Sequence, residues 1–228
     1  MSEQRLVLIR HAQGSLGTDD YDRLSVIGHR QARRIGHGVP VEAGVAHGVR
    51  GRLRRHRETA AYLDPGGRWH VDADLDEYRV DRLLATALAQ AHALGLQPPP
   101  QRAWDDPAGY LECFLKLFPR VLEAWQRGRI ECDANGRWSA FQGRVEAAAR
   151  RLSAAVAERG CVVAVTSAGV ISTMAASLLQ RDLGWQRRLN VSLYNAAVTE
   201  LVRGRDGRWD AVRINCVAHL EADQKTLA

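Results

Sequence analysis

Cysteine, lysine and long apolar runs are scarce in this sequence, and each scarcity excludes a class of protein. The cysteines are Cys113, Cys132, Cys161 and Cys216. They form no C-x-x-C pair and have no histidine at metal-ligand spacing, which excludes a zinc module and a small disulfide scaffold. No run approaches the ~20 apolar residues that cross a bilayer, and residues 1–5 lead into a strand without a signal-peptide pattern. We therefore expect a cytoplasmic protein with no metal and no membrane partner.

Length and composition are those of an ordinary globular protein. The chain has 228 residues, of which 46% are hydrophobic and 25% charged. These proportions exclude a disordered or collagen-like chain, and the length allows most of the unfolded surface to be buried. One α/β domain covering residues 1–228 is the expectation.

The net charge is +6, and almost all of the positive charge is arginine, since Lys116 and Lys225 are the only lysines. A GC-rich genome produces the same bias. In chemical terms, the planar guanidinium fork matches phosphate and carboxylate oxygens. Acidic residues are interspersed with the arginines and no nucleic-acid-binding motif is present, so nucleic acid is not an expected partner.

The first part of the chain predicts strands alternating with helices. Residues 5–10 form a continuous apolar run typical of a strand in a parallel sheet. After a loop over 11–22, Ser25 is the predicted N-cap of a helix that reaches about Gly36. A weaker strand is expected over 44–49 and a second helix over 53–63.

The stretch from Leu83 to Trp138 is predicted to be a helical insertion in the domain, because it lacks a β-α-β pattern; a separate domain is the alternative. It contains one helix over 83–94, a break at 98–100 and a second helix from about Pro107. Asp106 is the predicted N-cap of that second helix.

The α/β pattern returns after the insertion. A helix is predicted around Phe141–Val156, and the strongest buried-strand signal lies at 161–167. Gly169 turns that strand into a helix ending near Leu179, and a hairpin is expected over 197–203 and 209–215. The fold class is therefore α/β: a three-layer α/β/α sandwich with a mostly parallel sheet, which binds ligands at the carboxyl ends of its strands.

Two of these strand ends carry candidate functional residues. Arg10 and His11 end the first strand, and residues 166–169 end the long one. A buried arginine needs an anionic partner, and a histidine beside it can act as nucleophile or base. The alternative for His11 is a structural histidine bonded to a loop carbonyl.

Five ordered segments resemble the histidine phosphatase superfamily, also called phosphoglycerate mutase-like. Residues 8–13 (LIRHAQ) are similar to its arginine-histidine-glycine signature, and residues 24–32 (LSVIGHRQA) to its next segment. Residues 53–60 (LRRHRETA) are similar to the segment in which an arginine four residues before Thr-Ala binds phosphate. Leu75-Asp76-Glu77 resembles the segment with the acid/base carboxylate, and residues 215–220 resemble the closing strand and tail. Together the segments cover nearly the whole chain.

The resemblance implies a role for each matching residue. His11 would carry the phosphoryl group as a phosphohistidine, and Glu77 would protonate the leaving oxygen and then activate water. Arg10 and Arg55 would bind the phosphoryl oxygens. Ala168 and Gly169, at the start of a helix, would offer backbone N–H groups to phosphate. No cofactor is implied, and the oligomeric state is open.

The sequence departs from the family pattern at two positions. Ala12 replaces the glycine after the histidine, a small change if its φ is negative. Ala168 stands where the family has a second pocket histidine, and losing such a donor typically costs ~10²–10³ in rate. His29, His37, His47, His56, His70 and His92 are interpreted as surface or core residues rather than replacements, and His219 as a structural one.

The leading hypothesis is a phosphohydrolase for a small phosphorylated metabolite. The alternatives are a weakened or retired enzyme that binds a phosphorylated ligand or partner, and a mutase-type isomerase. Substrate choice is expected to lie in the insertion. Its aromatic residues are interpreted mainly as packing, with a pocket role as the alternative: Trp104, Tyr110, Phe114, Trp125 and Trp138.

Overall fold

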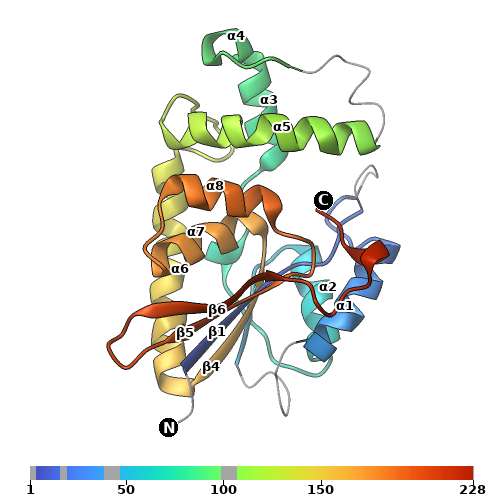
Figure 1. Ribbon diagram of the computed structural model, residues 1–228, viewed down its shortest axis with the longest axis vertical. Coiled ribbons are helices and arrows are strands. Elements are labelled where there is room, and N and C mark those ends of the chain that lie inside the picture. The colour runs from blue at the N-terminus through green and yellow to red at the C-terminus, as the bar shows by residue number, and fades with distance from the viewer. Residues whose placement is uncertain (1–3, 16–19, 39–46, 99–106, 228) are drawn as a thin grey trace.

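A twisted sheet lies at the centre of the computed structural model, which describes residues 4–15, 20–38, 47–98 and 107–227 (Figure 1). In this part of the chain the sheet has six strands in the order β3-β2-β4-β1-β5-β6. The strands are β1 (Gln4–Arg10), β2 (Gly48–Arg50), β3 (His70–Val71), β4 (Cys161–Thr166), β5 (Val198–Arg203) and β6 (Trp209–Cys216). β1 to β4 run parallel to one another, and β5 and β6 pair antiparallel. The prediction of a mostly parallel sheet is confirmed.

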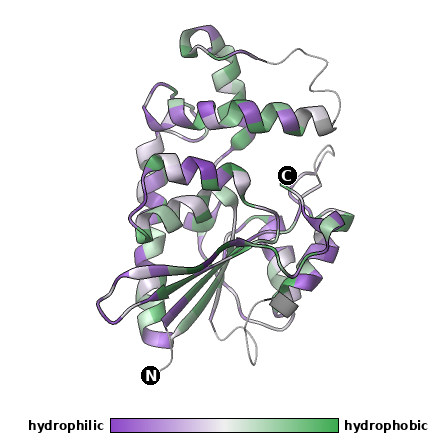
Figure 2. Ribbon diagram, in the orientation of Figure 1, coloured by the Kyte–Doolittle hydropathy of each residue, from purple (hydrophilic) through white to green (hydrophobic). Residues whose placement is uncertain are grey.

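Both faces of the sheet are covered, because successive side chains of a strand point to opposite faces. In β1, Leu6 and Leu8 pack into one hydrophobic cluster, whereas Val7 and Ile9 pack into the other. The first cluster lies under α6 (Trp138–Arg159) and α7 (Ala168–Leu178). The second lies under α1 (Val26–Gly38) and α2 (Arg54–Leu63). Figure 2 shows the apolar colouring along the central strands and the hydrophilic tip of the β5–β6 hairpin.

A group of helices extends the α6–α7 side beyond the sheet (Figure 1). These are α3 (Val80–Ala89), α4 (Ala91–Leu94), α5 (Pro107–Gln126) and α8 (Leu183–Ser192). Trp125 of α5 and Leu83 of α3 are fully buried in the same cluster as Leu6 and Leu8 of the sheet. These helices therefore pack against the same hydrophobic core as one face of the sheet.

Most predicted elements are present, with shifted ends. The Ser25 cap is confirmed, since its hydroxyl accepts the N–H of Gly28 at 3.0 Å. The helix expected over 83–94 begins earlier and consists of α3 and α4. β2 overlaps the weak strand predicted over 44–49 only at residues 48 and 49. Residues 44–46 of that prediction lie outside the described ranges, and so does the predicted cap Asp106.

Several short elements were not expected. They are β3, α8 and two turns of 3₁₀ helix, η1 (Ala73–Leu75) and η3 (Ala222–Gln224). β3 has two exposed residues, and α8 contains Gly184 and the polar run Gln186–Arg188, so neither leaves a strong periodic pattern in the sequence.

Candidate active site

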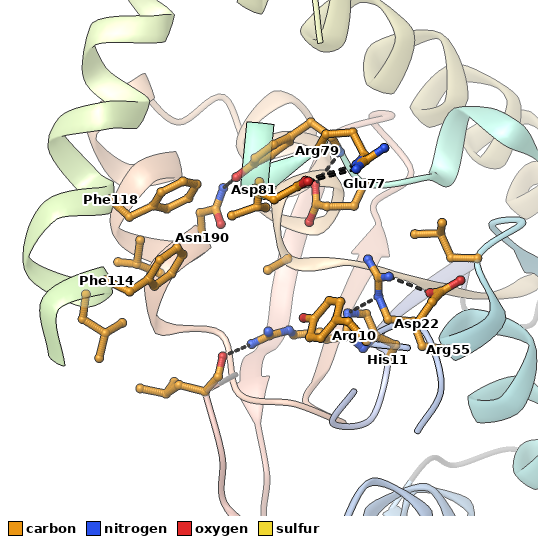
Figure 3. Close-up of a pocket in the computed structure, with 18 of the residues that line it drawn as sticks. Arg10, His11, Asp22, Arg55, Glu77, Arg79, Asp81, Phe114, Phe118 and Asn190 are labelled. Atoms are coloured by element: carbon orange, nitrogen blue, oxygen red, sulfur yellow. Dashed lines mark hydrogen bonds and ion pairs between the residues drawn. The ribbon is translucent and has the colours of Figure 1, made fainter. Parts of the chain in front are cut away.

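A cavity of about 760 Å³ opens where β1 and β4 end at their carboxyl edge (Figure 3). One half of its wall is charged or polar and includes Arg10, His11, Asp20, Asp22, Arg55 and Glu77. The other half is mainly apolar and includes Val80, Phe114, Leu115, Phe118 and Val191. The volume is typical of a small-molecule site. The structure thus brings Arg10, His11, Arg55, Glu77 and Ala168 to one cavity.

His11 is fixed by backbone groups directly after β1. The backbone N–H of His11 donates to the carbonyl of Thr166 at the end of β4, 2.8 Å away. Its ring Nδ1 lies 2.8 Å from the carbonyl of Ala12. A carbonyl only accepts, so Nδ1 carries the proton and Nε2 carries the lone pair. Nε2 in turn accepts the Nε–H of Arg55 at 3.1 Å.

The surroundings keep His11 neutral. Burial, followed by the positive charges of Arg55 and Arg10, holds the pKa of His11 well below its usual value of 6.5. The imidazole is therefore unprotonated at neutral pH, and its Nε2 is available as a nucleophile.

The backbone after His11 needs no glycine. The φ angle of Ala12 is not positive, so its methyl group causes no strain. The N–H of Ala12 donates to the hydroxyl of Thr59 at 3.1 Å, and that hydroxyl donates to the carbonyl of Arg55 at 2.8 Å. Thr59 thus ties the loop after the histidine to the helix that carries Arg55.

Arg55 lies in the first turn of α2 and points into the cavity. Its Nη1 forms an ion pair with Asp22 at 2.7 Å. The guanidinium lies over the ring of Tyr21, with the Arg55 Cζ 5.3 Å from the ring centroid. Asp22 and Tyr21 were not predicted as site residues; the acidic stretch Asp19–Asp22, shortly after the candidate nucleophile in the sequence, is the signal that could have identified them.

Two carbonyl groups hold the guanidinium group of Arg10 in place. Its Nη1 donates to Leu193 and, at 2.9 Å, to Leu227. Its Nε is buried and has no hydrogen-bond partner. The guanidinium group of Arg10 lies on the cavity wall and carries a positive charge that an oxyanion can approach. Nothing in the sequence marks Leu193 or Leu227 as partners.

Glu77 is held by backbone N–H groups. Its Oε2 accepts the N–H of Gly169 at 2.8 Å, and its Oε1 accepts the N–H of Tyr78 at 3.2 Å. Burial raises the pKa of Glu77, although the bond from Gly169 and the charge of Arg55 oppose the shift. A protonated carboxyl is therefore easier to populate here than in water.

Ala168, the first residue of α7, lies on the cavity wall directly after the turn that follows β4. Gly169 is not part of that wall, because its N–H faces Glu77 instead. A Cβ on Gly169 would clash with both Glu77 Oε1 and Tyr78 Cε1. The glycine is thus required by the close approach of the carboxylate.

His56 follows Arg55 on α2 but lies behind His11, outside the cavity wall. It is 0% exposed, and its ring centroid is 5.6 Å from that of His11. Its Nε2 lies 2.7 Å from the hydroxyl of Ser167, and its Nδ1 has no partner. Burial, followed by Arg55 and Arg50, holds the pKa of His56 well below 6.5. The structure therefore makes it a buried neutral histidine, in agreement with the expected core role.

The aromatic residues of the insertion divide between core and cavity. Trp125 and Trp138 are buried in the core, as the packing interpretation predicted. Phe114 lines the cavity, so for this residue the pocket alternative is correct. Trp104 and the side chain of Tyr110 lie outside the described residues. Asn190 of α8 also lines the cavity and was missed, because α8 itself was not predicted.

Metal-ion and membrane features are both lacking in the described ranges. These residues contain no cluster of three or more His, Cys, Asp or Glu side chains suited to a metal ion. Nor does any helix among them have the length and apolar character needed to cross a membrane.

Comparison with known proteins confirms the resemblance inferred from the motifs. Residues 112–217 match the model of the histidine phosphatase superfamily (branch 1). This stretch contains Ala168 and Gly169 and begins after Glu77. No curated protein sequence matches the chain.

Similar solved structures show the same fold over almost the whole chain. A mycobacterial hydrolase is 22% identical with a TM-score of 0.65, covering 98% of this chain and 95% of its own. Mycobacterial glucosyl-3-phosphoglycerate phosphatase, in complex with inorganic phosphate, is 23% identical with a TM-score of 0.63, covering 95% and 99%. The alpha-ribazole phosphatase of Shigella flexneri is 19% identical with a TM-score of 0.62, covering 93% and 96%. At these identities the likeness establishes the α/β fold.

Proposed function

We propose that this chain, similar to the histidine phosphatase superfamily in sequence motifs and fold, is a phosphomonoesterase for a small phosphorylated metabolite. The observation that carries the proposal is the setting of His11. Its neutral imidazole lies on the wall of a cavity in which two guanidinium groups and a carboxyl group converge, and its Nε2 lone pair accepts a hydrogen bond from Arg55. The phosphatases among the similar structures support the same class of reaction.

In the first step, the Nε2 of His11 attacks the phosphorus of the bound ester. A P–N bond forms while the bond between phosphorus and the leaving oxygen breaks. Glu77, whose pKa is raised by burial, donates its proton to that oxygen, so the product leaves as an alcohol. Arg55 exchanges its contact with His11 for the phosphoryl oxygens, and the guanidinium group of Arg10 on the cavity wall offsets their charge.

In the second step, water attacks the phosphohistidine. The carboxylate of Glu77 accepts a proton from the water, the P–N bond breaks, and inorganic phosphate leaves. Glu77 is again protonated and His11 is again neutral, so the cycle closes without a cofactor. Ala168 offers its backbone N–H at the start of α7 to the phosphoryl group, and Gly169 acts through its bond to Glu77.

A test compares His11→Ala with the wild-type protein on phenyl phosphate and on a panel of sugar and acid phosphates. We expect phosphate release by the wild type and a loss of roughly a thousandfold or more in kcat for the variant. Acid quenching during turnover should trap an acid-labile phosphoprotein in the wild type alone. His92→Ala is the control, because His92 is exposed and lies outside the cavity wall. Equal rates for His11→Ala and the wild type would overturn the proposal.

The second candidate is a binding protein that retains the pocket without turnover, and Ala168 is the observation in its favour. Ala168 is 8% exposed and lies on the cavity wall, so a histidine there would face the phosphoryl group. If the cavity is catalytic, Ala168→His should raise kcat on phenyl phosphate about tenfold or more. Binding of inorganic phosphate with no turnover by either protein would favour the second candidate.

A further inference from the structure

We propose that the half of the cavity away from His11 binds a neutral, aromatic or aliphatic leaving group, and not a second anionic group. This inference rests on the proposed phosphatase activity and names the class of its substrate. It would be a phosphomonoester of a phenol or of an apolar alcohol.

The apolar wall of this half is built mainly by α5. Figure 3 shows Phe114 and Phe118 projecting from that helix toward the cavity, across from Arg55 and Asp22. The two rings are stacked, with centroids 4.5 Å apart and planes inclined by 19°. Phe118 is only 2% exposed and also stacks with Tyr78 at 6.4 Å. The buried ring of Phe118 therefore holds Phe114 in place, and Phe114 remains half-exposed to receive a ligand.

Aliphatic side chains complete this wall. Leu115 follows Phe114 on α5, Val80 begins α3 and Val191 lies near the end of α8; all three are half-buried. Partly exposed apolar side chains on three separate helices leave water in contact with a concave apolar surface. Covering that surface with a ligand is favourable in proportion to the apolar area removed from water.

The polar groups of this half are already paired. Arg79 binds Asp81 through two hydrogen bonds, Nε to Oδ1 at 3.1 Å and Nη2 to Oδ2 at 2.9 Å. The side-chain amide of Asn190 donates to the hydroxyl of Tyr78 at 3.1 Å. Among the described residues that line this half, no cation lacks a carboxylate partner.

The other cations of the cavity wall, Arg10 and Arg55, belong to the half that contains His11. Arg10 donates to the carbonyl groups of Leu193 and Leu227, and Arg55 contacts His11 as well as Asp22. Both would be occupied by the phosphoryl group that is transferred. A carboxylate or second phosphate on the leaving group would lie against Phe114 and Leu115, or beside Arg79, whose charge Asp81 already balances. Both arrangements are unfavourable, because an anion would lose its hydration without gaining a cation.

A matched pair of esters tests this inference. In 4-ethylphenyl phosphate and 4-(carboxymethyl)phenyl phosphate the leaving groups have similar sizes, and the methylene group insulates the phenol from the charge. Their intrinsic reactivities are therefore close. We expect kcat/KM to be roughly tenfold or more higher for the ethyl ester, with most of the difference in KM. Equal values, or a preference for the carboxylate, would overturn the inference.

Substitutions test whether the apolar cavity wall causes the preference for the ethyl ester over the carboxymethyl ester. Phe114→Ala should reduce the preference to less than about threefold. Leu88→Ala should preserve it, because Leu88 is a half-buried apolar residue of the same insertion that packs on the core without lining the cavity. Leu115→Arg adds an unpaired cation and should raise kcat/KM for the carboxymethyl ester roughly tenfold or more. A Phe114→Ala protein that keeps the full preference would contradict the assignment.

The two proposals fail in distinguishable ways. If the wild type hydrolyses phenyl phosphate but does not discriminate within the pair, the phosphatase activity stands and the inference is wrong. If no ester is hydrolysed, the proposed function is wrong. In that case calorimetric titration of the His11→Ala protein with both esters still decides the inference. Binding of the ethyl ester roughly tenfold more tightly supports it, and equal affinities contradict it.

Discussion

Close contacts determine which residue is tolerated at some positions around the active site, and Gly169, behind Glu77, is the clearest case. Gly169→Ala would drive a methyl group into Glu77 Oε1, so the carboxylate must move and lose the N–H that holds it. We expect a folded protein with kcat on phenyl phosphate lowered about 10²–10⁴-fold, the usual contribution of general acid–base catalysis.

Gly143→Ala is the matched control for this substitution. Gly143 lies on α6, and an added Cβ there meets nothing within 4 Å. Its kcat should equal that of the wild type, and the protein should be stabilised by roughly 0.5–1 kcal/mol. A fully active Gly169→Ala protein would show that Glu77 does not need its present position.

The two buried histidines predict how stability changes with pH. The pKa values of His11 and His56 lie well below 6.5 in the folded protein, whereas an unfolded chain has ordinary values near 6.5. Below pH 6.5 the unfolded state therefore binds more protons. The free energy of unfolding should fall as the pH decreases, by about 1.4 kcal/mol per pH unit for each histidine.

Urea unfolding between about pH 6.5 and pH 5 measures this slope. His56→Gln should reduce the slope by about 1.4 kcal/mol per pH unit. His92→Ala should leave it unchanged, since His92 is exposed. Identical slopes for the wild type and His56→Gln would mean that His56 accepts a proton in the folded state.

At the scale of elements, the first helix α1 is joined to the loop of the nucleophile through its cap. The hydroxyl of Ser25 accepts the N–H of Gly28 and donates to the side chain of Gln13, which is 2.7 Å away. Ser25→Ala should lower the free energy of unfolding by about 1 kcal/mol. Denaturant titration measures the change. Ser153→Ala, within α6, removes only a bond to the helix backbone and should have a much smaller effect.

The sequence predicted elements whose pattern is strong and missed those with weak patterns. β1 and β4 are continuous apolar runs, and Ser25 caps the start of α1, so these elements were expected from local chemistry, although α1 continues past the predicted end at Gly36 to Gly38. β3 exists only because its backbone pairs with β2, and its two residues are exposed. Tertiary pairing of this kind leaves no periodic signal in the strand itself.

The residues of the candidate site also divide into those that the sequence predicted and those that it missed. Arg10, His11, Arg55 and Glu77 each lie at a recognisable place, a strand end or a motif, and all four line the cavity. Asn190, Leu193 and Leu227 reach the same region only through the folding of distant segments. Their contribution depends on contacts, which single-sequence patterns do not contain.

At the scale of the whole molecule, the end of the first strand and the last described residues lie side by side at the cavity. Gln31 donates to the carbonyl of Gln224 at 2.6 Å and to the hydroxyl of Thr226 at 2.9 Å. The N–H of Asn195 donates to the carbonyl of Thr226 at 2.8 Å. These bonds place Leu227 where its carbonyl receives Arg10.

Removal of residues 224–228 should therefore weaken substrate binding. Hydrogen bonds to charged groups are worth about 1.5–3 kcal/mol, so we expect KM for phenyl phosphate to rise roughly tenfold or more as Arg10 loses its position. Lys225→Ala is the control, because Lys225 is exposed and the backbone of the tail is kept. An unchanged KM in the truncated protein would show that Arg10 is held well enough by Leu193.

The hydrogen bond from Arg10 to the carbonyl of Leu227 also has a consequence for biosynthesis. During translation the nucleophile leaves the ribosome early, yet the wall beside it is absent until Leu227 has been added and has folded back. The nascent chain should therefore bind substrate weakly until Leu227 has emerged. A fusion partner attached behind Leu227 would begin beside the cavity, so reporters and affinity tags are better joined to the N-terminal side of the first strand.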